Sequence, residues 1–157
     1  MRTLVAALAA AFVFGPPGIT VTEVTGTPPT PGAVLAIVTT HHTEEEEADL
    51  SAQMISIRNG QQVARDLTVT KAEGKGRYGV TKQWDSGVAW VLVFTVKQGE
   101  NGSHGSASSI VRVDATGRVQ GIDKITSSNA RGDRYNSGAT KADIERAFGQ
   151  LGIRVGH

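Results

Sequence analysis

Histidines and carboxylates gathered in two segments are the residues of this sequence with the most specific chemical potential. His41 and His42 stand directly before an acidic run that includes Glu44 and Glu46, and His104 lies in a second, glycine-rich segment. Imidazole nitrogens together with a carboxylate oxygen form a ligand set that suits divalent zinc or copper. These five residues define one hypothesis, a copper or zinc site used for metal binding or sequestration.

The acidic run also has a simpler interpretation. Neighbouring histidines on a strand point to opposite faces, so both can join one site only if the backbone leaves the sheet at Thr40. A run of four glutamates is more often a solvated loop than a binding site. We therefore expect an acidic surface loop that needs no cofactor, and the metal site is the alternative.

Known catalytic motifs are missing from the sequence. It contains no G-x-S-x-G elbow, no H-E-x-x-H helix and no glycine loop placed before a helix to hold phosphate. The absence of cysteine excludes disulfides and thiolate chemistry. Arg131-Gly132-Asp133 matches an adhesion tripeptide by its letters, a match that chance explains. We expect a protein that is not an enzyme.

Size and charge limit the remaining classes. The 157 residues suit a single domain, and 39% hydrophobic with 20% charged residues is typical of a folded one. The 16 basic and 15 acidic residues leave a net charge of +1, far from the excess that binding to phosphates requires. Nucleic acid is therefore not an expected partner.

The N-terminal residues resemble an export signal. Arg2 precedes an apolar run over residues 4–14, and glycines and prolines at 15–18 close it. A run this short cannot anchor the chain in a bilayer, which needs about 20 apolar residues, and no longer run follows. We expect residues 1–18 to be a signal peptide, and the mature chain to be periplasmic or extracellular without a membrane span. A buried N-terminal helix is the alternative.

Short segments rich in valine, isoleucine and threonine make up most of the rest. We expect an extended, proline-rich segment at 19–32 and a domain at 33–126 whose strands are separated by turns every eight to twelve residues. The expected strands are 33–40, 52–58, 61–70, 77–84, 88–97, 107–113 and 118–125. Seven such strands predict an all-β, immunoglobulin-like antiparallel β-sandwich.

Turn residues indicate which connections lie together. Asn59-Gly60 predicts a type I′ hairpin, residues 114–117 a type I turn closed by glycine, and residues 85–87 a third short turn. If successive strands are antiparallel, these turns share one end of the sandwich. The longer connections 41–51, 71–76 and 98–106 then share the other end, where sandwich domains usually bind their ligands.

The segment from Val88 to Val96 is apolar on both faces, which predicts an interior strand. Trp84 and Trp90 flank the turn before it. We expect both tryptophans to pack in the core, and a ligand-stacking role is the alternative.

A helix is predicted after the sheet, at residues 140–152. Thr140 suits the N-cap with Asp143 three residues later, and apolar residues follow at helical spacing up to Gly152. We expect the apolar face of this amphipathic C-terminal helix to dock on an open edge or mouth of the sandwich. Residues 127–139 are expected to be a polar, mobile linker.

The segment Gly76-Arg-Tyr-Gly-Val-Thr-Lys-Gln-Trp-Asp-Ser-Gly-Val-Ala-Trp-Val-Leu-Val-Phe-Thr-Val96 resembles the YtkA-like and FixH-like exported sandwich domains. The hairpin at 57–63 is similar to one that those domains place upstream, so the resemblance covers residues 50–97. It implies an exported, non-catalytic sandwich that is sometimes found where metals are handled. The methionine-rich segment of many relatives is absent.

Together these observations favour an exported binding or interaction module with an unknown protein or glycan partner. Metal binding through the histidines is the first alternative. A structural component of an envelope assembly is the second, because the apolar strands and the helix could instead bury against a partner chain.

Overall fold

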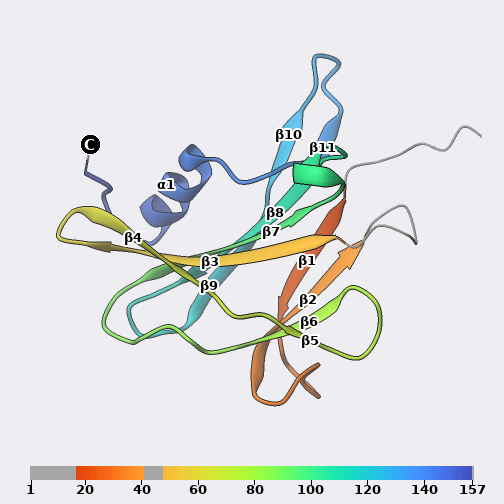
Figure 1. Cartoon of the computed structure of the whole chain (residues 1–157). Coiled ribbons are helices and arrows are strands. Elements are labelled where there is room, and N and C mark those ends of the chain that lie inside the picture. The colour runs from red at the N-terminus through yellow and green to blue at the C-terminus, as the bar shows by residue number, and fades with distance from the viewer. Residues whose placement is uncertain (1–16, 41–47, 157) are drawn as a thin grey trace, which may run out of the picture.

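Two antiparallel sheets pack face to face in the computed structural model, which describes residues 17–40 and 48–156 (Figure 1). The four-stranded sheet has the order β1-β2-β6-β5. Its strands are β1 (Gly18–Glu23), β2 (Ala33–Thr40), β5 (Thr70–Lys71) and β6 (Arg77–Thr81).

The five-stranded sheet has the order β4-β3-β7-β8-β9. Its strands are β3 (Asp49–Arg58), β4 (Gln61–Asp66), β7 (Trp90–Lys97), β8 (Ser106–Val113) and β9 (Val119–Lys124). A two-stranded hairpin of β10 (Thr126–Ser128) and β11 (Arg134–Asn136), the 3-10 turn η1 (Glu100–Gly102) and helix α1 (Lys141–Gln150) complete the fold. The described residues therefore form an all-β antiparallel sandwich with one short helix.

The main core lies between the two sheets. Strand β2 alternates in burial, with Leu35 and Ile37 inside and Val34 and Val38 exposed, which is the pattern of a strand covered on one face. Leu35 and Ile37 belong to the same buried cluster as Phe94 of the opposite sheet. The hydrophobic effect of this burial holds the two sheets together.

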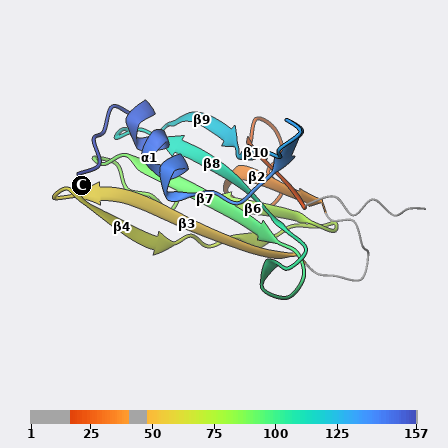
Figure 2. The same cartoon turned by 90° about the horizontal axis from the view of Figure 1, so that it is seen from above.

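A second apolar cluster lies on the outer face of the five-stranded sheet. Ile55, Val91 and Ile110 from three neighbouring strands pack there against Ala147 and Phe148 of α1. Figure 2 shows the helix lying across this sheet. The expectation that the helix docks on an edge or mouth of the sandwich is therefore wrong. Strand β7 is apolar on both faces because the four-stranded sheet packs on one face and α1 packs on the other.

Helix α1 lies within the range 140–152 in which the sequence predicts a helix. Thr140 and Asp143 form a capping box: the Thr140 Oγ1 accepts from the Asp143 N–H at 3.3 Å, and the Thr140 N–H donates to the Asp143 carboxylate at 2.8 Å. Gly152 ends the helix with a φ of 76°.

The turn predictions are confirmed in backbone geometry. Asn59 and Gly60 have φ of 51° and 77°, as a type I′ hairpin requires. In the turn at 114–117 the Gly117 N–H donates to the Asp114 carbonyl at 2.9 Å, and the φ of Gly117 is 85°.

Strand number differs from the prediction of seven: the described residues place nine in the two packed sheets. The expected strand 61–70 is interrupted after Asp66 because the Gln83 side chain binds both backbone groups of Thr68, at 2.9 Å and 2.8 Å, in place of a neighbouring strand. The extra strand β1 comes from a segment expected to lie outside the sandwich.

Two segments outside the expected domain are built into the fold. In 19–32, Ile19 and Val21 of β1 enter the core, and Thr30 is buried where a side chain on Gly79 would collide with it. In 127–139, the chain forms the β10–β11 hairpin and is not a structureless linker. The proposed signal 1–18 lies outside the described residues except for its end, where Gly18 begins β1.

Both tryptophans are buried, so the core interpretation is confirmed. Trp90 is fully buried, and its indole N–H donates to the Asp85 carbonyl at 3.0 Å. The guanidinium carbons of Arg58 and Arg65 lie 5.9 Å and 5.7 Å from its ring centroid. The Trp84 indole donates to the Gly117 carbonyl at 3.1 Å.

Candidate functional site

The sandwich has a tight end and an open end, as the turn pattern predicts. At the tight end the Gly87 N–H donates to the Ala115 carbonyl at 2.7 Å, and Arg65 of the β3–β4 hairpin lies 3.9 Å from Asp85. At the open end the Thr39 N–H donates to the Gly76 carbonyl at 2.8 Å, which joins β2 to the β5–β6 connection. The pairing of Asp49 with Lys97 places the β7–β8 connection beside the start of β3.

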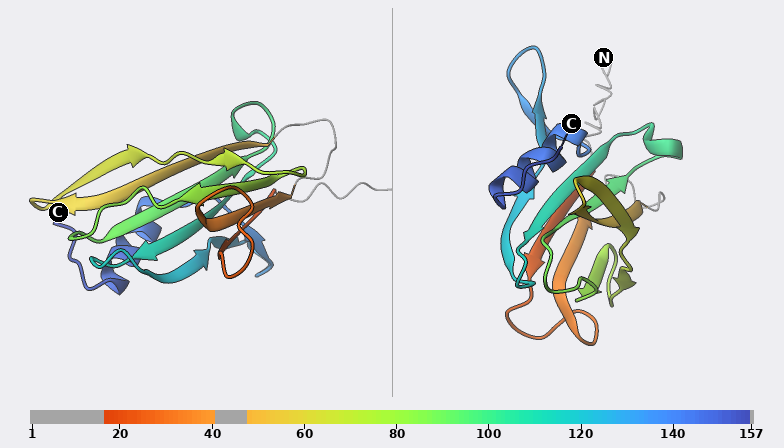
Figure 3. Two further views of the ribbon diagram at one scale, coloured as in Figure 1. Left: turned by 90° about the horizontal axis from the view of Figure 1, so that it is seen from below. Right: turned by 90° about the vertical axis from the view of Figure 1, so that its left-hand side faces the viewer.

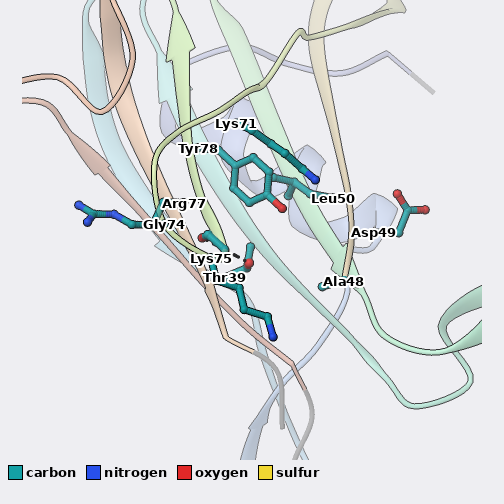
Figure 4. A pocket seen from close by; sticks show the side chains of 10 residues that line it. Thr39, Ala48, Asp49, Leu50, Lys71, Gly74, Lys75, Arg77 and Tyr78 are labelled. Atoms are coloured by element: carbon teal, nitrogen blue, oxygen red, sulfur yellow. Dashed lines mark hydrogen bonds between the residues drawn. The ribbon is translucent and has the colours of Figure 1, made fainter. Parts of the chain in front are cut away.

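A pocket of about 550 Å³ opens at this open end, between the start of β3 and the sheet that contains β5 and β6 (Figure 4). The lining comes from three stretches of the sequence: the end of β2, the start of β3, and the continuous segment from β5 through its connection to β6. Its lining residues are Thr39, Ala48, Asp49, Leu50, Lys71, Gly74, Lys75, Gly76, Arg77 and Tyr78.

Strand register places the aromatic wall of the pocket. Tyr78 pairs with Ile37 on one side and Lys71 on the other, so all three side chains are on the inner face of the sheet. Tyr78 and Leu50 are half-buried and pack against the main core. Figure 4 shows the Lys71 side chain running alongside the Tyr78 ring. The pocket therefore has an apolar floor and a polar rim.

A tight connection fixes the far wall. Gly74 and Gly76 have φ of 95° and 68°, which favour glycine, and a Cβ on Gly76 would lie 2.6 Å from the Thr39 carbonyl oxygen. Thr39 also donates its hydroxyl to the Gly76 carbonyl at 3.4 Å. Lys75 lies between these glycines, so its position follows from the turn.

Charge in the pocket lining is predominantly positive. Among the described lining residues, Lys71, Lys75 and Arg77 contribute three cations and Asp49 contributes the one carboxylate. The Arg77 and Asp49 side chains point outward from the Tyr78 ring, on opposite sides of the opening (Figure 4). Three cations in the lining of a pocket with an aromatic wall suit a ligand that carries negative charge.

The predicted metal ligands are only partly within the described residues. His41, His42, Glu44 and Glu46 lie outside them. His104 is exposed in the β7–β8 connection, and its backbone N–H donates to the Gln98 carbonyl at 3.0 Å. Within residues 17–40 and 48–156 no group of three or more metal-binding side chains is present.

Sequence reasoning named the 71–76 connection but missed Lys71, Lys75, Arg77 and Tyr78 as site residues. The signal that could have found them is the Gly74-Lys75-Gly76 turn flanked by basic residues. Exposed lysines and arginines are common on every surface, so this pattern identifies a site only after the pocket is known.

Another hollow, of about 240 Å³, lies between α1 and strands β9 and β10. Its two carboxylates pair within the protein, since Asp123 binds Arg112 at 3.0 Å and Asp143 binds Arg146 at 2.9 Å. The open-end pocket has more than twice this volume and lies at the end with the long connections, so it is the stronger candidate for a ligand site.

No protein-family model matches this chain, and no curated protein or solved structure is significantly similar to it. No helix of the described residues is long and apolar enough to cross a membrane. The functional argument therefore depends on the chemistry of the pocket and the surface.

Proposed function

We propose that this chain is an exported, non-catalytic binding module, periplasmic or extracellular, that holds its ligand in the open-end pocket. The observation that carries the proposal is the presence of Lys71, Lys75 and Arg77 in the described lining of a pocket walled by Tyr78, at the end of the sandwich with the long connections. A glycan or peptide with negative charge is the ligand class that fits this lining.

The proposal includes an immunoglobulin-like topology, which the strand order supports. Immunoglobulin domains pair strands A-B-E-D in one sheet and C-F-G in the other. If β1, β2, β5 and β6 correspond to A, B, D and E, the sheet order β1-β2-β6-β5 is the same. Strands β3, β7 and β8 then correspond to C, F and G, with β4 and β9 added at the two edges.

The proposal is tested by presenting the full chain with immobilised acidic and neutral polysaccharides and with acidic and neutral peptides. We expect binding to an acidic probe that falls about tenfold or more in the Lys75→Glu, Arg77→Glu double variant. The matched control, Arg118→Glu with Lys124→Glu, makes the same charge change elsewhere and should retain binding. Equal losses in both variants, or no binding to any acidic probe, would contradict the proposal.

Divalent-metal binding is the second candidate. The observation in its favour is that the Asp49–Lys97 pairing brings the connection with His104 beside Ala48, which directly follows the segment with the other two histidines. Calorimetry with Cu(II) and Zn(II) should show stoichiometric binding that is lost when His41, His42 and His104 become alanine. Binding no tighter than to an unstructured dihistidine peptide would exclude this function.

A structural role in an envelope assembly is the third candidate. It is favoured by the exposure of Val34 and Val38 on the outer face of the four-stranded sheet, at 38% and 43%. Cross-linking in intact cells that traps a partner through residue 38 would support it, and a chain that stays uncross-linked would exclude it.

A further inference from the structure

The β10–β11 hairpin presents the tripeptide Arg131-Gly132-Asp133 away from the body of the sandwich. Figure 1 and the right-hand view of Figure 3 both show the hairpin projecting beyond the two sheets. Every residue from 128 to 135 is exposed, and the tripeptide lies in the five-residue tip, 129–133, between the two strands. The tripeptide, whose sequence match chance could explain, is therefore accessible to a partner.

Asn129 holds this tip in one conformation. Its Oδ1 accepts from the backbone N–H of Arg131 at 2.9 Å and from that of Asp133 at 3.0 Å. The Gly132 N–H donates to the Asn129 carbonyl at 3.0 Å, and the φ of Gly132 is 85°, a conformation that favours glycine. Because the turn is ordered before binding, less conformational entropy is lost when a partner docks.

The base of the hairpin is also fixed to the domain. The Asn136 amide donates to the Pro17 carbonyl at 3.3 Å, next to strand β1. The Arg134 guanidinium donates to the Thr126 hydroxyl at 2.7 Å across the two strands. These contacts hold the tip at a defined place relative to the sandwich.

The two charged side chains of the tip have complementary binding chemistry. In the described part of the chain the Arg131 guanidinium takes part in no hydrogen bond or ion pair, and a guanidinium binds a carboxylate through two parallel hydrogen bonds. One oxygen of Asp133, Oδ2, accepts from the Asn129 amide at 3.0 Å. Its other oxygen can coordinate a hard divalent cation such as Mg²⁺.

We propose that the 129–133 tip binds an adhesion receptor of the Arg-Gly-Asp-recognising kind, which offers a carboxylate to Arg131 and a bound divalent cation to Asp133. Gly132 leaves the space between the two side chains open, so a receptor surface can approach the backbone. This surface and its partner are independent of the open-end pocket and go beyond the function proposed above.

The test measures attachment of mammalian fibroblasts to the immobilised full chain in buffer with Mg²⁺. We expect attachment that chelation of the cation or the soluble peptide Gly-Arg-Gly-Asp-Ser abolishes. The charge-conserving variants Asp133→Glu and Arg131→Lys should each raise the coating concentration for half-maximal attachment about tenfold or more, since both change geometry and keep charge. Arg118→Lys, an exposed arginine elsewhere, should have no effect.

Asn129→Ala tests how much the fixed conformation of the turn adds to the binding by Arg131 and Asp133. We expect a smaller rise in the half-maximal coating concentration, because this variant keeps both charged groups and loosens only the turn. Circular dichroism should show that all variants remain folded, since the changed residues are exposed. Attachment that survives Asp133→Glu, or that needs no divalent cation, would overturn the proposal, as would the absence of any attachment.

Discussion

The outer faces of the two sheets differ in what covers them. On the five-stranded sheet, Val91 and Ile110 are almost fully buried under α1. On the four-stranded sheet, β2 leaves Val34 and Val38 exposed, and no helix within residues 17–40 and 48–156 covers them. The same residue type is therefore a core residue on one face and a surface residue on the other.

The difference explains two sequence patterns. Strand β2 alternates because only one of its faces is buried, whereas β7 is apolar throughout because the second sheet and the helix each bury one face. A strand that is apolar on both faces thus requires two covering layers, and the helix is the second layer.

The largest expected effect comes from placing a charge on each face. Val91→Asp buries an unpaired carboxylate under α1 and should lower the free energy of unfolding by about 5 kcal/mol, enough to unfold a marginally stable domain. Val38→Asp leaves the new carboxylate in water and should change the free energy of unfolding by less than about 0.5 kcal/mol. Urea unfolding of both variants measures the contrast, and similar losses would show that the faces are not different.

A cavity under the helix should have the next largest effect. Phe148 is fully buried between α1 and the sheet, so Phe148→Ala should cost about 3–4 kcal/mol of unfolding free energy. Val38→Ala, on the exposed outer face of the four-stranded sheet, is the matched control and should lower the free energy of unfolding by only a few tenths of a kcal/mol. A small loss for Phe148→Ala would mean that the helix adds little to stability.

Loss of the N-cap should have a smaller effect. Thr140→Ala removes the hydroxyl that accepts from the Asp143 N–H and should cost about 1 kcal/mol. Thr20→Ala, on an exposed position of the bare sheet face, makes the same chemical change without a cap and should be nearly neutral. Thermal unfolding of the two variants separates a capping effect from the general cost of removing a threonine.

The smallest expected effect is a pH dependence of the helix cover. Burial raises the pKa of Asp143, but hydrogen bonds from Thr140 and Arg146 and the charge of Arg146 outweigh it, so the pKa is lowered overall. A lowered pKa contributes stability above the ordinary value of about 4, and this stability is lost as the pH falls through the lowered pKa. The stability difference between the natural chain and Asp143→Asn should therefore narrow from pH 7 to pH 3 in urea unfolding; an unchanged difference would contradict this.

Local signals predicted a large part of the fold. Asn59-Gly60 and the pair Thr140 and Asp143 specify their turn and cap through neighbouring atoms, so sequence alone indicates them. The end of β4 depends instead on the Gln83 side chain binding Thr68 fifteen residues earlier, which no local pattern indicates. The β10–β11 hairpin was missed because its strands have only three residues each and are mostly polar.

The sequence predicted at which end of the sandwich the candidate site lies, but it did not identify the residues that line the site. Antiparallel alternation indicates that the long connections share one end. By contrast, Leu50 and Tyr78 line the same pocket only because of how the two sheets pack. Thr39 contacts Gly76 because β2 pairs with β6, and these strands are about 40 residues apart. Such pairings follow from the whole fold.

Helix α1 follows every strand of the sheet that it covers, and this order has a consequence for folding during synthesis. Strands β3, β7 and β8 are complete by residue 113, whereas the apolar cover of their outer face comes from residues 139–155. Until residues 139–155 emerge from the ribosome, a nascent chain exposes the apolar outer surface of this sheet to water. During this interval the chain is most prone to aggregate, and a chaperone would find the largest exposed apolar surface to bind.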